Sequence, residues 1–244
     1  MKYCDVSWVC GLRNAAMVAL CSVMLAACAP APEDKEAGVL QDPFETVNRG
    51  IFSFNEVVDN VVLEPVARAY RFLVPEYGRQ RVSNVLSNLT MPVVFINSVL
   101  QGDPGNAFSS LFSFVLNSTF GVAGIFDFVG ANTDLQVHKE DFGQTLGVWG
   151  FGSGAYIMLP ILGPSSARDT VGLVADWFTD PFNYADNEVV ITRTVLRTID
   201  ARADTLDLTD EVYRTSLDPY ATFRSGYLQK RDAMVKNTHS QDTE

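Results

Sequence analysis

The sequence is poor in the residue types that most often supply catalytic or metal-binding side chains. It contains two His and four Cys in 244 residues, and all four cysteines lie within the first 28 positions. The remainder of the chain therefore has little material for a zinc site and none for a disulfide. Basic residues are also fewer than acidic ones: the chain has 18 Lys and Arg and 29 Asp and Glu, which gives a net charge of −11. This acidity argues against a protein that binds nucleic-acid phosphates.

Apolar residues, in contrast, are plentiful. They make up 47% of the chain, whereas charged residues make up only 19%. A chain of this length and composition can bury one sizeable core and is too apolar to be disordered.

The N-terminal end has the organisation of a secretory signal. Lys2 and Arg13 precede an uncharged apolar run of 13 residues, Ala15 to Ala27, which is too short to span a bilayer. The run ends in Leu25-Ala26-Ala27-Cys28, which resembles the bacterial lipobox. This resemblance implies that residues 1–27 are a lipoprotein signal peptide and that Cys28 becomes the lipidated N-terminus, carrying an N-acyl diglyceride with palmitate. The alternative is an ordinary secretory signal with a chance cysteine.

Cleavage at this point would change what the mature chain contains. Cys4, Cys10 and Cys21 would be lost, and the one remaining sulfur would be a thioether, so neither a disulfide nor a thiolate metal ligand could form. The signal peptide carries one net positive charge, so the mature charge becomes −12. Ala29 stands where lipoproteins retained at the inner membrane usually carry Asp, and this resemblance to the sorting rule favours the outer membrane.

The mature chain shows one helical domain between two short polar segments. Residues 28–41 contain proline and acidic residues without apolar periodicity and are expected to form a tether, whereas residues 237–244 are expected to be a disordered tail. In the domain, residues 42–236, Asp42 is expected to cap the first helix with Pro43 at its first position. No stretch alternates with period two, so an all-α fold is predicted. Apolar spacing and turn residues predict helices over 43–62, 66–73, 77–89, 93–100, 107–120, 169–178, 188–206 and 219–236.

The middle of the chain has very few charges. Val82 to Ala175, 94 residues, contains eight charged side chains, and three windows within it contain none. Proline and glycine interrupt these windows, and the exposed backbone at such breaks would be costly in a membrane-spanning segment. A soluble domain would carry charge on the outer face of every surface helix. We therefore predict a body that lies partly within one leaflet, with apolar surface outward and small polar residues inward; the alternative is a large core covered by the charged terminal thirds.

Eight fragments, in order along nearly all of the mature chain, resemble the MlaA (VacJ) family of outer-membrane lipoproteins. Each fragment alone is weak, but eight in the right order make a chance match improbable. Ser113 departs from the pattern, because members often have a basic residue there, so no phosphate contact is carried over to it. The fragments are Asp42–Asn55, Glu64–Tyr70, Asn97–Pro104, Asn117–Gly124, Asp141–Leu146, Gly150–Tyr156, Pro160–Asp169 and Asp218–Arg231.

The resemblance implies both an architecture and a function. The fold would be a compact helical ring in the inner leaflet of the outer membrane, facing the periplasm, with a central amphipathic channel and an associated trimeric porin. Such proteins remove phospholipids misplaced in the outer leaflet. They pass them to a periplasmic lipid-binding protein that feeds an inner-membrane ABC transporter, and so maintain lipid asymmetry by intermembrane transport.

A channel for lipid needs a polar path for the headgroup and an apolar path for the tails. Gly147, Gly150, Gly152 and Gly154 permit close backbone approach and unusual dihedral angles, which suits a loop that flexes or lines a narrow passage. The alternative is a set of ordinary tight-turn glycines. Arg168 could bind a phosphate through two hydrogen bonds, and the alternative is a salt bridge to a neighbouring acid such as Asp169.

Two further arginines lie four residues apart on a predicted helix. Arg193 and Arg197 repel each other by roughly 0.2–0.5 kcal/mol at this spacing, and Arg193 lies at the edge of the apolar stripe. A cation at such an edge in an acidic protein is a candidate headgroup contact, and plain salt bridging is the alternative.

Two rival functions use the same membrane setting. A phospholipase would need a nucleophile and a base, but His239 lies in the predicted tail and His138 is expected in a surface loop. Ser153 does not fit the GxSxG pattern, and Asp176 with Asp180 could at most hold a metal through carboxylates. The chain is therefore expected not to be an enzyme and to need no cofactor beyond the lipid on Cys28. A structural lipoprotein that braces porins is the second rival.

Overall fold

The computed structural model describes residues 42–133 and 135–239. These residues belong to one compact unit that begins at Asp42. The predicted signal peptide, Cys28 and tether lie outside the described residues, as do residues 240–244. The described elements are α2 (Glu45–Val58), η1 (Asp59–Leu63), α3 (Glu64–Leu73), α4 (Glu76–Asn88), α5 (Met91–Gln101), α6 (Pro104–Thr119), α7 (Phe128–Asn132), α8 (Phe142–Val148), β1 (Tyr156–Leu159), β2 (Gly163–Ser166), α9 (Ala167–Thr179), η2 (Pro181–Tyr184), α10 (Asn187–Thr215) and α11 (Pro219–His239).

The predicted all-α class is confirmed, and the local signals in the sequence explain several helix ends. The Val74-Pro75 pair ends α3 as predicted. Pro65, in contrast, does not begin a separate helix, because the π-helix η1 joins α2 to α3 and the chain is helical from Glu45 to Leu73. Ser166 caps α9 by accepting a hydrogen bond from the Asp169 N–H at 3.1 Å, as its position three residues earlier predicted. Asp103 caps α6 in the same way through the Asn106 N–H.

The start of the domain differs from the prediction. Asp42 does not cap the first helix, because α2 begins at Glu45 and residues 42–44 form a turn. The Asp42 carboxylate instead accepts hydrogen bonds from the Phe44 N–H at 3.1 Å and from the Asn48 side chain at 2.8 Å. It also accepts from the Tyr220 hydroxyl and pairs with Arg224, both on α11. Asp42 therefore fastens the first residues of the domain to its last helix.

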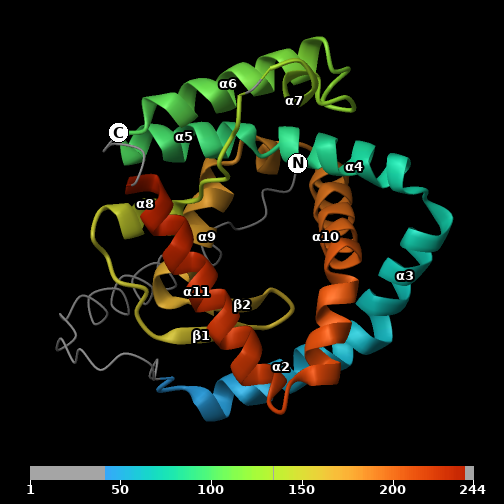
Figure 1. Cartoon of the computed structure of the whole chain (residues 1–244), viewed down its shortest axis with the longest axis vertical. Coiled ribbons are helices and arrows are strands. Elements are labelled where there is room, and N and C mark those ends of the chain that lie inside the picture. The colour runs from blue at the N-terminus through green and yellow to red at the C-terminus, as the bar shows by residue number, and fades with distance from the viewer. Residues whose placement is uncertain (1–41, 134, 240–244) are drawn as a thin grey trace, which may run out of the picture. The chain divides into compact units, whose positions relative to one another are not determined.

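The elements pack in a closed circuit, which Figure 1 shows as a ring of helices. Each element contacts the next in the order α2, β1, β2, α9, α8, α5, α6, α4, α10, α3, η1 and back to α2. Helix α11 crosses the circuit and packs against α8 and β2. Helix α10 lies on the inner side of the ring and α3 on the outer side (Figure 1).

A short β-hairpin within the circuit was not predicted. Strands β1 and β2 pair antiparallel, with Tyr156 opposite Ser166 and Leu159 opposite Gly163. Two asparagines of α2 bind the free edge of β1. The Asn48 side chain donates to the Tyr156 carbonyl and accepts from the Met158 N–H. The Asn55 side chain likewise donates to the Leu159 carbonyl and accepts from the Ile161 N–H, and all four distances are 3.0 Å or less. Strands of four residues are too short to show an alternation of polar and apolar residues in the sequence. The hydrogen bonds at the free edge of β1 come from side chains about one hundred positions earlier in the chain.

Burial in this fold is close to the reverse of that in a soluble domain. Among the described residues, 18 polar or charged residues are buried and only 11 hydrophobic ones are, while 34 large hydrophobic residues are exposed. Soluble monomers expose single apolar side chains but rarely contiguous apolar patches. The small hydrophobic core is divided into two clusters, of which one centres on Tyr156, Met158 and Tyr220 and the other on Ala67, Ala203 and Leu206.

The α5–α6 pair shows this reversal most clearly. The two helices pack against each other through small polar side chains, while apolar side chains point away from the pair. This agrees with the predicted orientation of polar residues inward and apolar residues outward, and it contradicts the alternative of a large apolar core. The buried polar residues are Asn97, Ser98, Asn106, Ser109, Ser110, Ser113 and Asn117, and the buried apolar ones are Val94 and Ala107; the exposed apolar residues are Val99, Leu100, Phe108, Leu111 and Val115.

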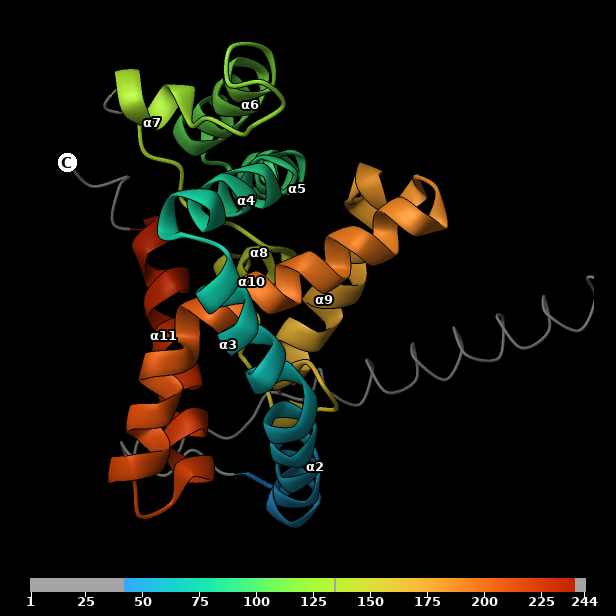
Figure 2. The same ribbon diagram turned by 90° about the vertical axis from the view of Figure 1, so that its right-hand side faces the viewer.

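A second apolar surface covers the end of α9, η2 and the beginning of α10. Figure 2 shows these three segments projecting together from the side of the ring. We call residues 173–196 the apolar projection. Its exposed apolar side chains are Leu173, Val174, Trp177, Phe178, Tyr184, Val189, Ile191, Val195 and Leu196.

Some helix boundaries also differ from the prediction. Helix α10 continues to Thr215, beyond the predicted end at 206, and α11 continues to His239, so residues 237–239 are helical and not part of a tail. The glycine-rich middle contains the short helices α7 and α8.

In the part of the chain that the structure describes, no single helix combines the length and hydropathy of a membrane span, although the pair α4–α5, bent by 45°, meets both criteria together.

Candidate functional site

The four candidate glycines fall into two environments. Gly147 lies in α8 and not in a loop, which corrects the prediction for this residue. A Cβ at Gly147 would lie 2.7 Å from the Val235 side chain and 2.9 Å from Arg168 Nη1. Gly147 is therefore required for the close packing of α8 against α11 and the Arg168 side chain.

Gly150, Gly152 and Gly154 lie in the segment that connects α8 to β1. Gly150 and Gly154 have φ of +94° and +68°, which residues other than glycine adopt only at an energetic cost. A Cβ at Gly150 or Gly152 would meet nothing within 4 Å. The segment is held mainly at its ends, where the Phe151 N–H donates to the Leu146 carbonyl and the Arg168 N–H to the Ser153 carbonyl. At Gly150 and Gly152 the backbone therefore faces open space on the side where a Cβ would lie.

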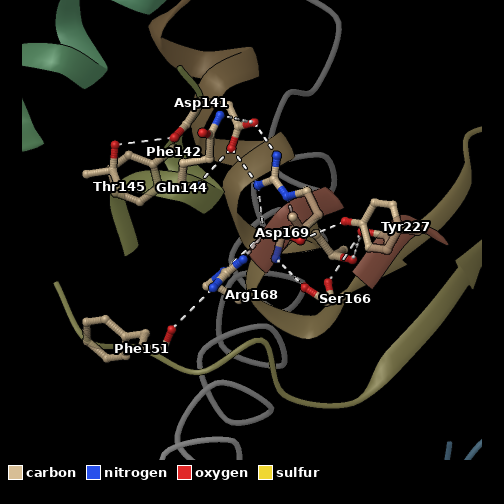
Figure 3. Close-up of polar contacts among 12 residues, drawn as sticks. Asp141, Phe142, Gln144, Thr145, Phe151, Ser166, Arg168, Asp169 and Tyr227 are labelled. Atoms are coloured by element: carbon tan, nitrogen blue, oxygen red, sulfur yellow. Dashed lines mark hydrogen bonds and ion pairs between the residues drawn. The ribbon is translucent and has the colours of Figure 1, made fainter. Parts of the chain in front are cut away.

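Arg168 lies at the base of this segment in a buried cluster of charges (Figure 3). Its Nε donates to Asp169 Oδ1 at 3.0 Å, which is the salt bridge that the sequence offered as the alternative to a phosphate contact. Its Nη1 lies 3.5 Å from the Phe151 carbonyl in the glycine segment. Nη2 is buried and, within the described residues, lacks a hydrogen-bond partner with good geometry although Asp169 Oδ1 is 3.0 Å away. Arg168 is therefore buried beside the glycine segment, and Asp169 compensates its charge.

Arg231 of α11 holds the same cluster together. Its guanidinium donates to both oxygens of Asp141 at 2.6 and 2.8 Å and to both oxygens of Asp169 at 2.9 and 3.1 Å. Burial alone would raise the pKa of Asp169, but the hydrogen bonds from Arg231 and Tyr227 outweigh it and hold that pKa at about 2. Asp169 therefore remains ionised, and three helices are joined at this point: α8, α9 and α11.

A buried polar network lies next to this cluster and connects α5, α8 and α9. Thr145 donates to Asn97, and Asn97 donates to Asp176 at 2.9 Å. Burial raises the pKa of Asp176 to about 6, and burial raises the pKa of Glu140 to about 7. The only neutral donor to the Glu140 side chain among the described residues is Gln101, at 2.9 Å. Acidic groups thus outnumber bases in this interior region.

Arg193 is fully paired. Its Nη1 lies 2.6 Å from Asp180 Oδ2, and both side chains are 9% exposed. The guanidinium also lies 5.4 Å from the Phe182 ring centroid, and Nη2 is 3.4 Å from the Leu89 carbonyl. The structure thus realises the salt bridge that was the alternative to a headgroup contact, and it places this ion pair inside the apolar projection.

Arg197, one turn further along α10, has a different environment. It has no hydrogen bond or ion pair to any described residue, and its side chain is accessible. The surrounding protein nevertheless lowers the pKa of Arg197 through desolvation, and the positive charge of Arg193 lowers it further. Arg197 is therefore an accessible cation in an enclosed position on the inner helix of the ring.

The buried asparagines are the positions that sequence reasoning missed. Asn48 and Asn55 bind the β-hairpin, and Asn97, Asn106 and Asn117 lie between helices or between a helix and a loop. The available signal was the occurrence of Asn within apolar helical stretches, where a polar side chain needs a buried partner.

The residues that a rival chemistry would use are not brought together. His138 lies exposed in the loop before α8, as predicted, and Asp176 and Asp180 have separate partners. In residues 42–133 and 135–239, no group of three or more His, Cys, Asp or Glu side chains could hold a metal ion.

Comparison with known proteins gives a consistent set of relatives. A model of the family described as MlaA lipoprotein matches residues 40–234. The chain is 37% identical over 224 residues to the intermembrane phospholipid transport system lipoprotein MlaA of Escherichia coli (strain K12), which covers 91% of this chain and 88% of that protein. It is 34% identical over 222 residues to the protein described in the same words from Haemophilus influenzae, covering 89% and 88%.

A solved structure also matches. It comes from work on the structural basis for maintenance of bacterial outer membrane lipid asymmetry, with a TM-score of 0.72 and 37% identity. The match covers 80% of this chain and 99% of the solved one.

Proposed function

Because this chain belongs to the MlaA lipoprotein family, we propose that it removes mislocalised phospholipids from the outer leaflet of the outer membrane and passes them to a periplasmic lipid-binding protein. That carrier would feed an inner-membrane ABC transporter, and the result would be the maintenance of lipid asymmetry. The work is physical transfer without covalent chemistry, and the chain acts without a cofactor other than the N-acyl diglyceride on Cys28. This lipid anchors it at the periplasm-facing inner leaflet beside a trimeric porin.

The reversed burial carries this proposal. The α5–α6 pair and the apolar projection expose apolar side chains over whole helix faces, while asparagine and serine lie between helices. In water this arrangement would cost roughly 25 cal/mol for each Å² of exposed apolar surface, and contact with acyl chains removes that cost. The ring is therefore suited to lie within one leaflet with its helices bordering lipid.

The inside of the ring supplies the proposed path for the headgroup. Arg197 is an accessible unpaired cation on α10, and the segment that contains Gly150 and Gly152 offers backbone that no Cβ covers. A phosphate could contact the Arg197 guanidinium while its acyl chains follow apolar surface. Arg193 supports the path indirectly, since its pair with Asp180 fixes the helix that carries Arg197.

The test replaces the unpaired cation and leaves the paired one intact. A Gram-negative strain that lacks its own MlaA lipoprotein is complemented with this chain or with Arg197→Glu, and outer-leaflet phospholipid is measured by susceptibility to added phospholipase. We expect the wild type to clear the outer leaflet and Arg197→Glu to leave phospholipid there at an equal protein level. Arg214→Glu, an exposed position on the same helix, is the matched control.

The outcomes also separate the rivals. A wild-type chain that binds porin but leaves outer-leaflet phospholipid unchanged would identify a structural lipoprotein. Release of fatty acid or lysophospholipid by the purified chain would identify a phospholipase. Metabolic labelling with a palmitate analogue tests the anchor separately, and equal labelling of the wild type and Cys28→Ala would contradict it.

A further inference from the structure

Arg81 of α4 is a cation without a protein counter-charge, in a chain with an excess of acids. It makes no ion pair and no hydrogen bond to any described residue, and its Nε is buried without a partner. Its guanidinium carbon lies 4.1 Å from the ring centroid of Tyr77 and 4.9 Å from that of Phe126. Two aromatic rings thus hold the guanidinium in place and leave its outer donors free.

Phe126 belongs to a loop with an unusual backbone. After α6 the chain makes a tight turn in which Val122, Ala123 and Gly124 have φ of +54°, +56° and +87°. Only Gly adopts this conformation without cost, and for a β-branched residue such as Val it is a clear outlier. We call residues 120–126 the strained loop.

Several contacts hold the strained loop in this conformation. The Gly124 N–H donates to the Asn117 carbonyl at 2.8 Å, and the Phe126 N–H donates to the Gly121 carbonyl at 2.9 Å. A Cβ at Gly121 would lie 2.2 Å from the Phe126 carbonyl oxygen. The loop is therefore a built feature, and its exposed side chains do not result from fraying.

The exposed side chains of the strained loop are apolar. Phe120 is 66% exposed and Val122 57% exposed, and Phe126 and Tyr77 are exposed beside them. An aqueous loop with positive φ would use Gly or Asn at lower cost. An apolar tip next to aromatic rings and a free guanidinium is the arrangement of the membrane interface, where apolar side chains enter the acyl region and Arg and Tyr remain at headgroup depth.

We propose that the strained loop inserts into a phospholipid leaflet while the Arg81 guanidinium binds the phosphate of a lipid headgroup at its base. The site would thus orient one edge of the ring against the leaflet. It takes any diacyl phospholipid, because the phosphate is the group that Arg81 recognises. This inference rests on the leaflet placement in the proposed function, and it concerns a site distinct from the path along α10.

The test measures the depth of the loop in a bilayer. The full-length lipoprotein carrying Phe120→Cys is labelled with the fluorophore NBD and reconstituted into nanodiscs of phosphatidylethanolamine and phosphatidylglycerol. Gln229→Cys, on the exposed side of α11, is the control position, and the unsubstituted protein is the labelling blank. We expect quenching of the label at 120 by lipid with a doxyl group at acyl carbon 5 and protection from iodide, with the reverse at 229.

Substitution of Arg81 then tests the headgroup contact. Arg81→Gln in the labelled protein should weaken insertion roughly fivefold, as expected for the loss of one arginine at an anionic lipid surface. Arg81→Lys should retain most of the insertion, and Arg214→Gln should have no effect. In nanodiscs of digalactosyl diglyceride, which has no phosphate, the wild type should behave like Arg81→Gln. Added inorganic phosphate that reduces insertion only at high concentration would assign the site to lipid-borne phosphate, whereas strong competition would assign it to free phosphate and overturn the proposal.

The native tryptophans separate this inference from the proposed function. Trp149 and Trp177 are exposed on other parts of the ring. If lipid quenches them but not the label at 120, the leaflet placement stands and the loop proposal is wrong. If lipid quenches neither, the leaflet placement itself fails. A label at 120 that is protected from both iodide and lipid quencher would indicate a protein contact and would also overturn the loop proposal.

Discussion

Replacement of the buried carboxylate of Glu140 by an amide should stabilise the protein at neutral and alkaline pH. Glu140 is 8% exposed, and its carboxylate accepts from Gln101 Nε2 at 2.9 Å while Asp103 and Asp141 repel its charge. Gln101 Oε1 is buried and has no hydrogen-bond partner among the described residues. The change Glu140→Gln removes the charge, retains an acceptor for Gln101 Nε2 and adds a donor beside the unpartnered oxygen.

The size of the effect follows from the pKa. Burial, and to a lesser degree the neighbouring carboxylates, raise the pKa of Glu140 from its ordinary 4.5 to about 7. Below pH 4.5 the group is protonated in both the folded and the unfolded chain. Between pH 4.5 and 7 only the unfolded chain loses its proton, so the free energy of unfolding falls by up to about 3 kcal/mol and remains low above pH 7. We expect a measured gain of about 1–3 kcal/mol for Glu140→Gln at pH 8.

The assay is urea unfolding of the full chain in detergent, followed by circular dichroism from pH 4 to pH 8. The stability difference between Glu140→Gln and wild type should grow as pH rises through this range and level off near pH 7. Glu76→Gln, at an exposed position of α4, should show no such dependence. A variant less stable than wild type at pH 8, or a difference equal at pH 4 and pH 8, would refute the reasoning.

Three further substitutions test other parts of the fold. Gly172→Ala would place a Cβ 2.3 Å from the backbone of α8 and should lower stability by about 1–3 kcal/mol in thermal unfolding, whereas Gly226→Ala, with nothing within 4 Å, should not. Asp169→Asn should lower the free energy of unfolding by about 2 kcal/mol at pH 7, because the lowered pKa of Asp169 contributes stability above pH 4 that is lost as pH falls toward 2. Urea unfolding of both proteins at pH 7 and near pH 2 should therefore show a difference that is large at pH 7 and small near pH 2. Asn55→Ala should leave the Ile161 N–H without its acceptor and speed its hydrogen exchange, and unchanged exchange would show that Asn55 does not hold the hairpin tip.

The sequence predicted the helices well wherever their ends depend on local chemistry. The Val74-Pro75 pair ends α3, and the Ser166 hydroxyl caps α9. These signals act over three or four residues, so they work in the same way in almost any tertiary context. The scarcity of charge in the middle of the chain likewise indicated an outward apolar surface, because charge density is a property of composition.

The β-hairpin and the role of Asp42 could not be predicted for the opposite reason. Each strand has four residues, and the edge of β1 is completed by Asn48 and Asn55 from a helix about one hundred positions earlier. Asp42 has the sequence context of a helix cap, yet its oxygens bind Tyr220 and Arg224 at the far end of the domain. Local patterns carry no information about partners at such separations.

The sequence by itself determined the lipobox-like motif, the helical class, the charge-poor middle, and the three arginines and four glycines worth considering as lipid contacts. Only the tertiary structure decided which cations are already neutralised. Arg193 forms an ion pair with Asp180, and Arg168 forms one with Asp169, whereas Arg197 and Arg81 have no acidic partner among the described residues. The physical reason is that an ion pair depends on a separation of about 3–4 Å in space, and that distance is fixed by helix packing and not by position along the chain.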